Sequence, residues 1–196
     1  MELLIFSAGI ASHWLSMLQL ARRGRIFASV MAVLLFSAQP GPAGEVVMTS
    51  EKELKVAFLY NFALYTEWPM PLADGLTFCL VGYNDLGSAL DALSSRQIGG
   101  KPIVLRHLEA QDLHADTGAC HVMYSAALSE VKLAKVANDL RQKPILSIAE
   151  GAGAEYSMIG LARDGNRLVF DINNSRARAA GLTFSSKLLR LARSVR

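Results

Sequence analysis

Short apolar runs separated by polar turns follow one another along most of the chain. Four of these runs have the length of strands, and they lie at 77–82, 102–108, 120–125 and 144–149. Strands that are apolar nearly throughout are typical of a parallel sheet covered on both faces. Helices are expected between them, at 87–95 and 129–141. This alternation indicates an α/β fold.

A longer helix is expected before the first strand, at 50–68, ended by Pro69. Ser50 and Glu53 fit a capping box at its start. Residues 56–65 are apolar or aromatic except Asn61. Such a helix must be covered on several sides, by its own core, by a second copy or by a partner. The candidates for a dimer or partner contact are Phe58, Tyr60, Asn61, Phe62 and Trp68.

The pattern changes after residue 157. Two apolar segments, 158–163 and 167–172, flank an Asp-Gly-Asn turn, which predicts an antiparallel hairpin. A helical turn or two at 173–180 and a final helix at 182–195 follow. We therefore expect one α/β domain with a mostly parallel sheet of about six strands, helices on both faces and a C-terminal antiparallel hairpin.

The first 43 residues predict export. Arg22, Arg23 and Arg25 precede an apolar stretch at 26–36, and a small, turn-forming segment follows. This is the order of a secretory signal peptide, with cleavage expected after Ala43. The apolar stretch is too short to span about 30 Å of hydrocarbon, although an uncleaved anchor is the alternative. The sequence thus predicts a signal peptide at 1–43 and a periplasmic domain at 44–196.

Net charge gives no reason to expect nucleic acid as a partner. The formal charge of the chain is +3, from 20 basic and 17 acidic residues. Residues 1–43 contain three arginines and one glutamate, so the remaining chain has 17 basic and 16 acidic residues and is nearly neutral. The positive charge gathers in residues 163–196, with eight basic and two acidic side chains. An anion or an acidic partner could bind there, unless this is only a solvated face with capping serines. The candidate residues are Arg176, Arg178, Ser185, Ser186, Lys187 and Arg190.

Residue patterns of enzymes and metal sites are absent from the sequence. There is no Gly-x-Ser-x-Gly, Gly-Lys-Ser/Thr or Cys-x-x-Cys. His107, His114 and His121 recur at intervals of seven, which is not a known ligand spacing. We predict no catalytic residues, metal or cofactor. In an exported chain, Cys79 and Cys120 indicate a disulfide, with two buried thiols as the alternative.

Three stretches together resemble the YfiR-like family of exported proteins, and they lie at 54–69, 159–173 and 179–193. The strand beginnings at Phe78 and Cys120 fit between them. The resemblance implies a periplasmic α/β domain without catalytic activity. Cys79 and Cys120 match a cysteine pair of the family, whereas a second pair, expected around 149–158, is absent here.

The resemblance also implies a function. The chain would be a homodimeric regulator that restrains an inner-membrane signalling protein, a diguanylate cyclase or a sensor kinase, through protein contacts. Restraint of a cyclase would lower cyclic di-GMP and biofilm formation, and an outer-membrane lipoprotein would be a further partner. The alternative is a stand-alone sensor whose basic C-terminal residues hold a nucleotide or a carboxylate.

Overall fold

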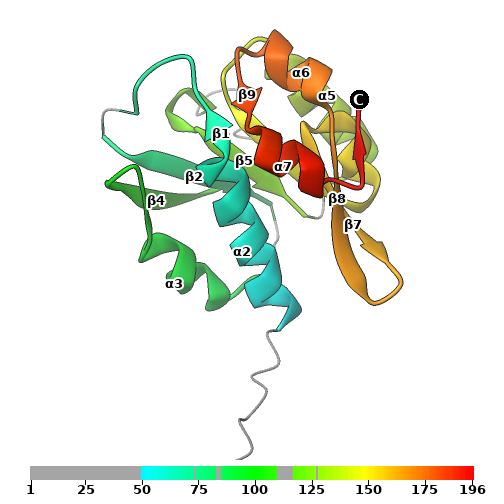
Figure 1. Ribbon diagram of the computed structural model, residues 1–196, viewed down its shortest axis with the longest axis horizontal. Coiled ribbons are helices and arrows are strands. Elements are labelled where there is room, and N and C mark those ends of the chain that lie inside the picture. Colours follow the sequence, from blue (N-terminus) through cyan, green and yellow to red (C-terminus); the bar gives the residue numbers. More distant parts are fainter. Residues whose placement is uncertain (1–49, 73, 83–84, 110–116, 127) are drawn as a thin grey trace, which may run out of the picture. The chain divides into compact units, whose positions relative to one another are not determined.

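The computed structural model describes residues 50–72, 74–82, 85–109, 117–126 and 128–196 (Figure 1). These residues belong to one compact unit, Thr49–Arg196. The predicted signal peptide lies outside them. Within the described part, no helix is long and apolar enough to cross a membrane.

One sheet of eight strands has the order β10-β8-β7-β6-β5-β2-β4-β3. Its six longer strands are the six expected ones: β2 (Leu76–Val81), β4 (Lys101–Leu108), β5 (Val122–Ser125), β6 (Leu146–Glu150), β7 (Ile159–Asp164) and β8 (Arg167–Ile172). Neighbours from β4 to β7 pair in parallel, whereas β7 and β8 form the predicted antiparallel hairpin. The predicted fold class is therefore confirmed.

Four two-residue strands raise the count above six. They are β1 (Thr66–Glu67), β3 (Gln97–Ile98), β9 (Thr183–Phe184) and β10 (Ser194–Val195). β3 and β10 lie at the two edges of the sheet, and β1 pairs with β9 in a separate antiparallel ribbon. Strands this short leave no periodic signal in a sequence, because their pairing is decided by distant segments.

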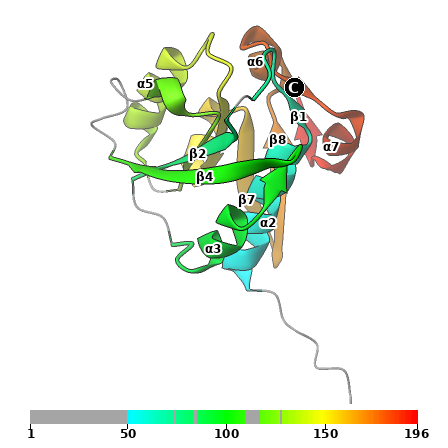
Figure 2. The ribbon, with the colours of Figure 1, turned by 90° about the vertical axis from the view of Figure 1, so that its left-hand side faces the viewer.

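Helices cover both faces of the sheet, as expected. They are α2 (Glu51–Leu64), α3 (Ala89–Ser94), α5 (Glu130–Asp139), α6 (Asn174–Ala179) and α7 (Ser186–Leu191), with 3-10 turns η1 (Thr117–Ala119) and η2 (Gly151–Tyr156). Side chains of β2 alternate between two cores: Phe78 and Leu80 join the core with α2, whereas Cys79 and Val81 join a smaller core with α5. Figure 2 shows α2 and α5 on opposite sides of the sheet.

The start of α2 is confirmed and its end is not. Ser50 Oγ accepts a hydrogen bond from the Glu53 backbone N–H at 3.2 Å, and Glu53 Oε2 accepts one from the Ser50 N–H at 2.8 Å. The helix ends at Leu64, because the chain turns into β1 to pair with β9. The expectation of a helix to residue 68 is wrong, and Trp68 lies beyond both elements.

The final helix is also shorter than predicted. Ser185 Oγ accepts from the Leu188 N–H at 3.3 Å, so it caps α7 as expected. The helix stops at Leu191 rather than at 195, because β10 adds in parallel to the edge of β8. The Arg193 N–H donates to the Phe170 carbonyl at 2.8 Å. This pairing gives the last residues hydrogen bonds that a longer helix would have supplied internally.

Candidate functional site

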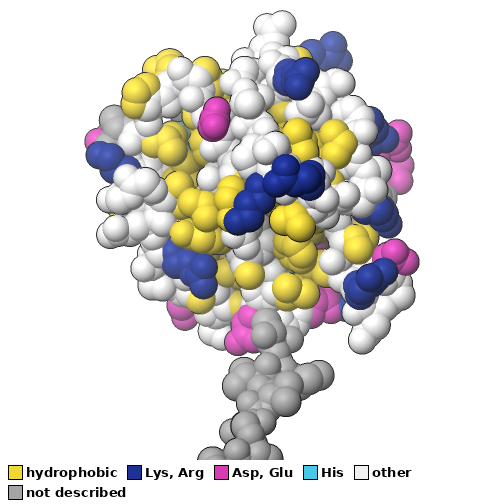
Figure 3. Space-filling view, in the orientation of Figure 1, with side chains coloured by type: hydrophobic (Ala, Val, Ile, Leu, Met, Phe, Trp, Pro, Cys, Tyr) yellow, Lys and Arg dark blue, Asp and Glu magenta, His cyan; other side chains and the backbone are white. Residues whose placement is uncertain are grey.

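The outward side of α2 carries an apolar stripe. Leu54, Ala57, Asn61 and Leu64 follow one another at helical spacing, and both leucines are 39% exposed. The single polar member, Asn61, donates from Nδ2 to the Ala57 carbonyl at 2.8 Å, so its amide turns back to the helix. We call these four residues the α2 stripe. Figure 3 shows hydrophobic side chains gathered over α2 and α7 on this face.

Cations lie on both sides of the α2 stripe. The Arg96 guanidinium carbon is 4.7 Å from the Tyr60 ring centroid, beside α3. On the α7 side, Lys187 Nζ donates to the Tyr65 hydroxyl at 2.7 Å and lies 4.8 Å from that ring's centroid. Figure 1 shows α3 and α7 on opposite sides of α2. Cation–π contacts therefore hold a positive charge along each border of the stripe.

The aromatic partner candidates divide between surface and core. Tyr60 and Asn61 are half-buried on α2, and the Tyr60 hydroxyl donates to the Gln97 carbonyl at 3.1 Å. Phe62 is completely buried, with its ring centroid 4.8 Å from that of Phe170. Phe58 stacks on Phe62 at 5.6 Å and stays half-buried. In this conformation Phe62 cannot contact a partner, and its role is core packing.

The basic candidates lie on two different helices. Arg176 and Arg178 belong to α6, whereas Ser186, Lys187 and Arg190 belong to α7, behind the cap residue Ser185. Arg178, Lys187 and Arg190 are exposed, and Arg176 is half-buried. Because Lys187 contacts Tyr65, the C-cap residue of α2, it belongs with the border of the α2 stripe rather than with an anion pocket at a helix start.

An ion-pair cluster around the buried Lys55, which the sequence analysis missed, joins α2 to the sheet. Lys55 Nζ lies 2.9 Å from Glu150 Oε2, 3.5 Å from Glu51 Oε1 and 3.8 Å from Asp85 Oδ1, and the lysine side chain is only 8% exposed. The Tyr124 hydroxyl donates to Glu150 Oε1. Burial first, and then Glu150, raise the pKa of Tyr124 above its usual range, so it stays a neutral donor.

This cluster lies where open α/β sheets commonly bind ligands. The order β4-β2-β5 reverses the direction of strand addition at β2, and such a reversal leaves a crevice at the carboxyl ends of the strands. Tyr124 and Glu150 come from the ends of β5 and β6, and Asp85 follows β2. Lys55 and its partners lie at this end of the sheet, where a cavity of about 630 Å³ also opens at the ends of β2 and β4. We assign the cluster a structural role, because the ion pairs of Lys55 tie α2 to β6.

The predicted disulfide is present. Cys79 in β2 and Cys120 before β5 are bonded, with their Cα atoms 5.8 Å apart and both side chains buried. Across the described segments there is no free cysteine and no cluster of three potential metal ligands. His121, next to the disulfide, accepts the Thr77 backbone N–H on Nδ1 at 3.1 Å. His114 lies outside the described residues.

Comparison with known structures supports the fold. A conserved domain protein from Vibrio cholerae aligns with a TM-score of 0.51 at 14% identity, covering 75% of this chain and 60% of its own. The ABC domain from Streptococcus pneumonia in complex with L-Trp gives 0.52 at 10% identity, covering 72% and 62%. The chain thus spans about three fifths of the length of each. No curated protein sequence matches it.

Comparison with protein families is more specific. The model of the YfiR/HmsC-like family matches residues 52–193, which includes α2, the hairpin and α7. These are the three stretches whose motifs the sequence analysis singled out. The match covers nearly all of the described residues. The chain belongs to the YfiR/HmsC-like family.

Proposed function

We propose that this protein is a non-catalytic periplasmic regulator that restrains an inner-membrane signalling protein, a diguanylate cyclase or a sensor kinase, through protein contacts. The family is generally periplasmic and regulatory. The observation that carries the proposal is the α2 stripe with its two cationic borders. Its two exposed leucines and the adjoining apolar side chains offer an apolar face that a partner would cover.

The chemistry of this surface specifies the chemistry of its partner. Leu54 and Leu64 offer apolar contact, while Arg96 and Lys187 would pair with carboxylates at the edges of the interface. Leu191 of α7, which is 64% exposed, extends the apolar area beyond Lys187. The partner surface is therefore expected to be apolar at its centre and acidic at its rim.

Restraint of an enzyme through binding requires a difference in affinity. The partner must have an inactive and an active state, and this domain must bind the inactive state more tightly. A shift from 1:99 to 99:1 needs a preference of about 10⁴-fold. Binding that is equally tight to both states would leave signalling unchanged.

Competition for the same surface would allow control of this restraint. We place a second copy of the chain, in the predicted homodimer, and an outer-membrane lipoprotein as further partners of the protein. Either one would free the signalling protein if it covered the α2 stripe. These partners are part of the proposal, as is the signal peptide at 1–43 that would deliver the chain to the periplasm.

A deletion experiment tests the function. Loss of the gene should raise cyclic di-GMP and biofilm if the target is a cyclase, and the wild-type chain should restore both. Leu64→Glu should fail to restore them, because it places a charge in the stripe. The matched control is Val131→Glu on α5, where the exposed valine lies on the other side of the sheet. The tagged wild-type chain should co-purify with an inner-membrane signalling protein. Unchanged cyclic di-GMP together with no such protein recovered would reject the proposal.

The alternative function, a small-ligand sensor, is tested separately by thermal shift. If the basic C-terminal residues hold a nucleotide or a carboxylate, that ligand at 100 times its Kd should stabilise the protein by about 2.7 kcal/mol. Arg178→Ala should remove the thermal shift. The absence of a shift with every anion tested would reject a ligand at α6 and α7.

A further inference from the structure

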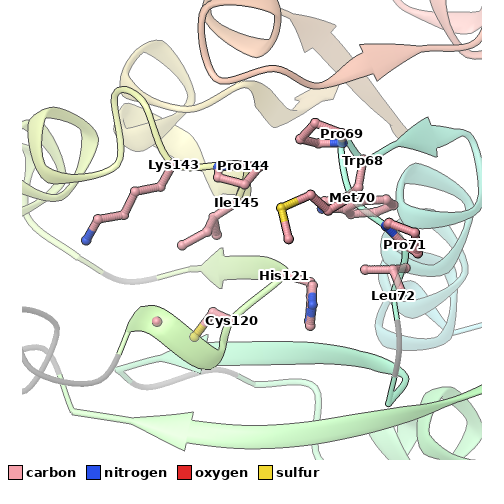
Figure 4. Close-up of a pocket in the computed structure, with 11 residues that line it drawn as sticks. Trp68, Pro69, Met70, Pro71, Leu72, Cys120, His121, Lys143, Pro144 and Ile145 are labelled. Carbon is pink, nitrogen blue, oxygen red and sulfur yellow. The ribbon is translucent and has the colours of Figure 1, made fainter.

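A cavity of about 360 Å³ lies at the amino ends of the parallel strands, and none of its lining residues belongs to the α2 stripe. One wall is the segment after β1, another is the segment before β6, and the third carries the disulfide (Figure 4). The lining residues that matter below are Trp68, Met70, Cys120, His121, Lys143 and Ile145. The volume is within the range of small-molecule sites, toward its lower end.

The walls of this cavity are restrained by covalent structure. Pro69, Pro71 and Pro144 fix the backbone on two sides, since each proline ring locks φ. The third side is tied to β2 by the disulfide of Cys120. A site with such walls loses little conformational entropy when a ligand enters.

Two N–H groups of the lining residues can donate to a ligand. Trp68 Nε1 is buried and has no hydrogen-bond partner among the described residues. His121 uses Nδ1 to accept the Thr77 N–H, so its remaining proton is on Nε2, which can donate to a ligand. Burial lowers the pKa of His121, which keeps the ring in this neutral form. A buried donor without an acceptor is costly, and a ligand oxygen would remove that cost.

The charge of the lining favours an anion. No aspartate or glutamate is among the described residues that line the cavity, and the one charged side chain among them is Lys143. Most other lining side chains are apolar. In Figure 4, Met70 reaches across the cavity toward Ile145, although it is 73% exposed. A methionine at this position can adapt to ligands of different shape.

We propose that this cavity binds a small apolar carboxylate, whose oxygens accept hydrogen bonds from Trp68 Nε1 and His121 Nε2 while its apolar body packs on Met70 and Ile145. The site is independent of the α2 stripe and of the proposed partner contacts. A free amino acid should bind more weakly than the matching carboxylate, because the described lining residues include no acidic side chain that could pair with its ammonium group.

The test uses 3-phenylpropionate as the probe and the full-length chain. Titration should give saturable binding and shift the indole N–H signal of Trp68 in the NMR spectrum. The signal is assigned by its absence in Trp68→Phe, which distinguishes it from that of Trp14. The neutral amide 3-phenylpropionamide should bind at least tenfold more weakly, and phenylalanine several-fold more weakly. Acetate, which lacks the apolar body, should show no saturable shift.

Introducing a charge at Met70 tests the site without disturbing the core, because that side chain is exposed. Met70→Asp should weaken 3-phenylpropionate binding about tenfold, and Met70→Lys should leave it equal or tighter. Val131→Asp on α5 is the matched control, with no expected effect. Leu64→Glu should leave probe binding unchanged, so failure of this site and failure of the proposed function are distinguishable.

Two results would overturn the proposal. One is no saturable binding of 3-phenylpropionate, or of the aliphatic probe 4-methylpentanoate, at millimolar concentration. The other is binding that neither Trp68→Phe nor Met70→Asp weakens, which would assign the carboxylate to a different place on the protein.

Discussion

Removal of the buried ammonium group of Lys55 should destabilise the domain more than loss of any surface ion pair described above. Lys55→Met keeps most of the side-chain volume and deletes the charge that faces Glu150 at 2.9 Å. Glu150 would then lie beside Tyr124 and Asp85 without a cation. Because Lys55 comes from α2 and Glu150 from β6, the change also loosens the attachment of the helix to the sheet.

The magnitude follows from burial. Deleting one partner of a buried pair costs about 3–5 kcal/mol. Glu150 is 19% exposed and can recover some hydration, so we expect the lower end, about 3 kcal/mol. For a chain of this size, that lowers Tm by about 6–12 °C. Lys55→Met/Glu150→Gln removes both charges and keeps an acceptor for Tyr124, so it should recover about 2 kcal/mol of the loss.

Urea unfolding followed by circular dichroism measures these differences. Arg163→Met is the matched control, because Arg163 pairs with Glu51 but is 60% exposed, so its loss should cost less than about 1 kcal/mol. A single Lys55→Met variant as stable as Arg163→Met would refute the reasoning. A double variant less stable than Lys55→Met would also refute it, because the reasoning predicts that neutralising Glu150 recovers stability.

Three further changes have specific expected outcomes. Cys79→Ala/Cys120→Ala should lower the free energy of unfolding by about 4 kcal/mol, because it removes a cross-link between residues 41 positions apart in the sequence. Equal stability of the variant and the oxidised wild type in urea would contradict this. The lowered pKa of His121 means that its folded form resists protonation, so stability should be complete above about pH 6.5 and fall as the pH drops below that value. His121→Asn, which can still accept the Thr77 N–H, should flatten this fall, and an unchanged pH profile would exclude His121 as its source. Gly160→Ala should cost about 1–3 kcal/mol, because the added Cβ would lie 2.4 Å from Ala154 Cβ, whereas Gly118→Ala, with open space around it, should be neutral by thermal unfolding.

Most of the sheet could be predicted because its strands are short, apolar and bounded by turn residues. The same local signals identified the Ser50 capping box and the Asp164-Gly165-Asn166 turn, which the structure confirms. The disulfide was predictable from the expected export, since two cysteines of an exported chain would meet an oxidising environment. These features depend on neighbouring residues or on composition, so no knowledge of distant contacts was needed.

Features decided by distant segments could not be predicted. Helix α2 is apolar on nearly every side, so its sequence did not indicate which residues face the core. The buried Phe62 could therefore not be distinguished from the exposed Leu64. The burial of Lys55 could not be predicted from its neighbours, because its partner Glu150 lies far along the chain. The residue pattern after Leu191 predicted that the helix continues. In the structure, the last residues instead pair with the edge of β8 as strand β10.

The same limitation applied to the candidate sites. Lys187 was predicted as part of an anion pocket with the arginines of α6, and its contact with Tyr65 became visible only in the fold. Trp68 was assigned to a helix face, whereas it lines the cavity beside the disulfide. Both residues were singled out by their chemistry, and their neighbours were set by the long-range ribbon of β1 and β9.

Site-specific photo-crosslinking in living cells tests the central claim most directly. A photoreactive residue is placed at Leu64 in the α2 stripe and, separately, at Val131 on α5, both of which are exposed. The account predicts that Leu64 yields an adduct with an inner-membrane signalling protein, identified by mass spectrometry, and that Val131 does not. No such adduct at Leu64, or equal adducts at the two positions, would contradict the claim that this protein acts through its α2 stripe.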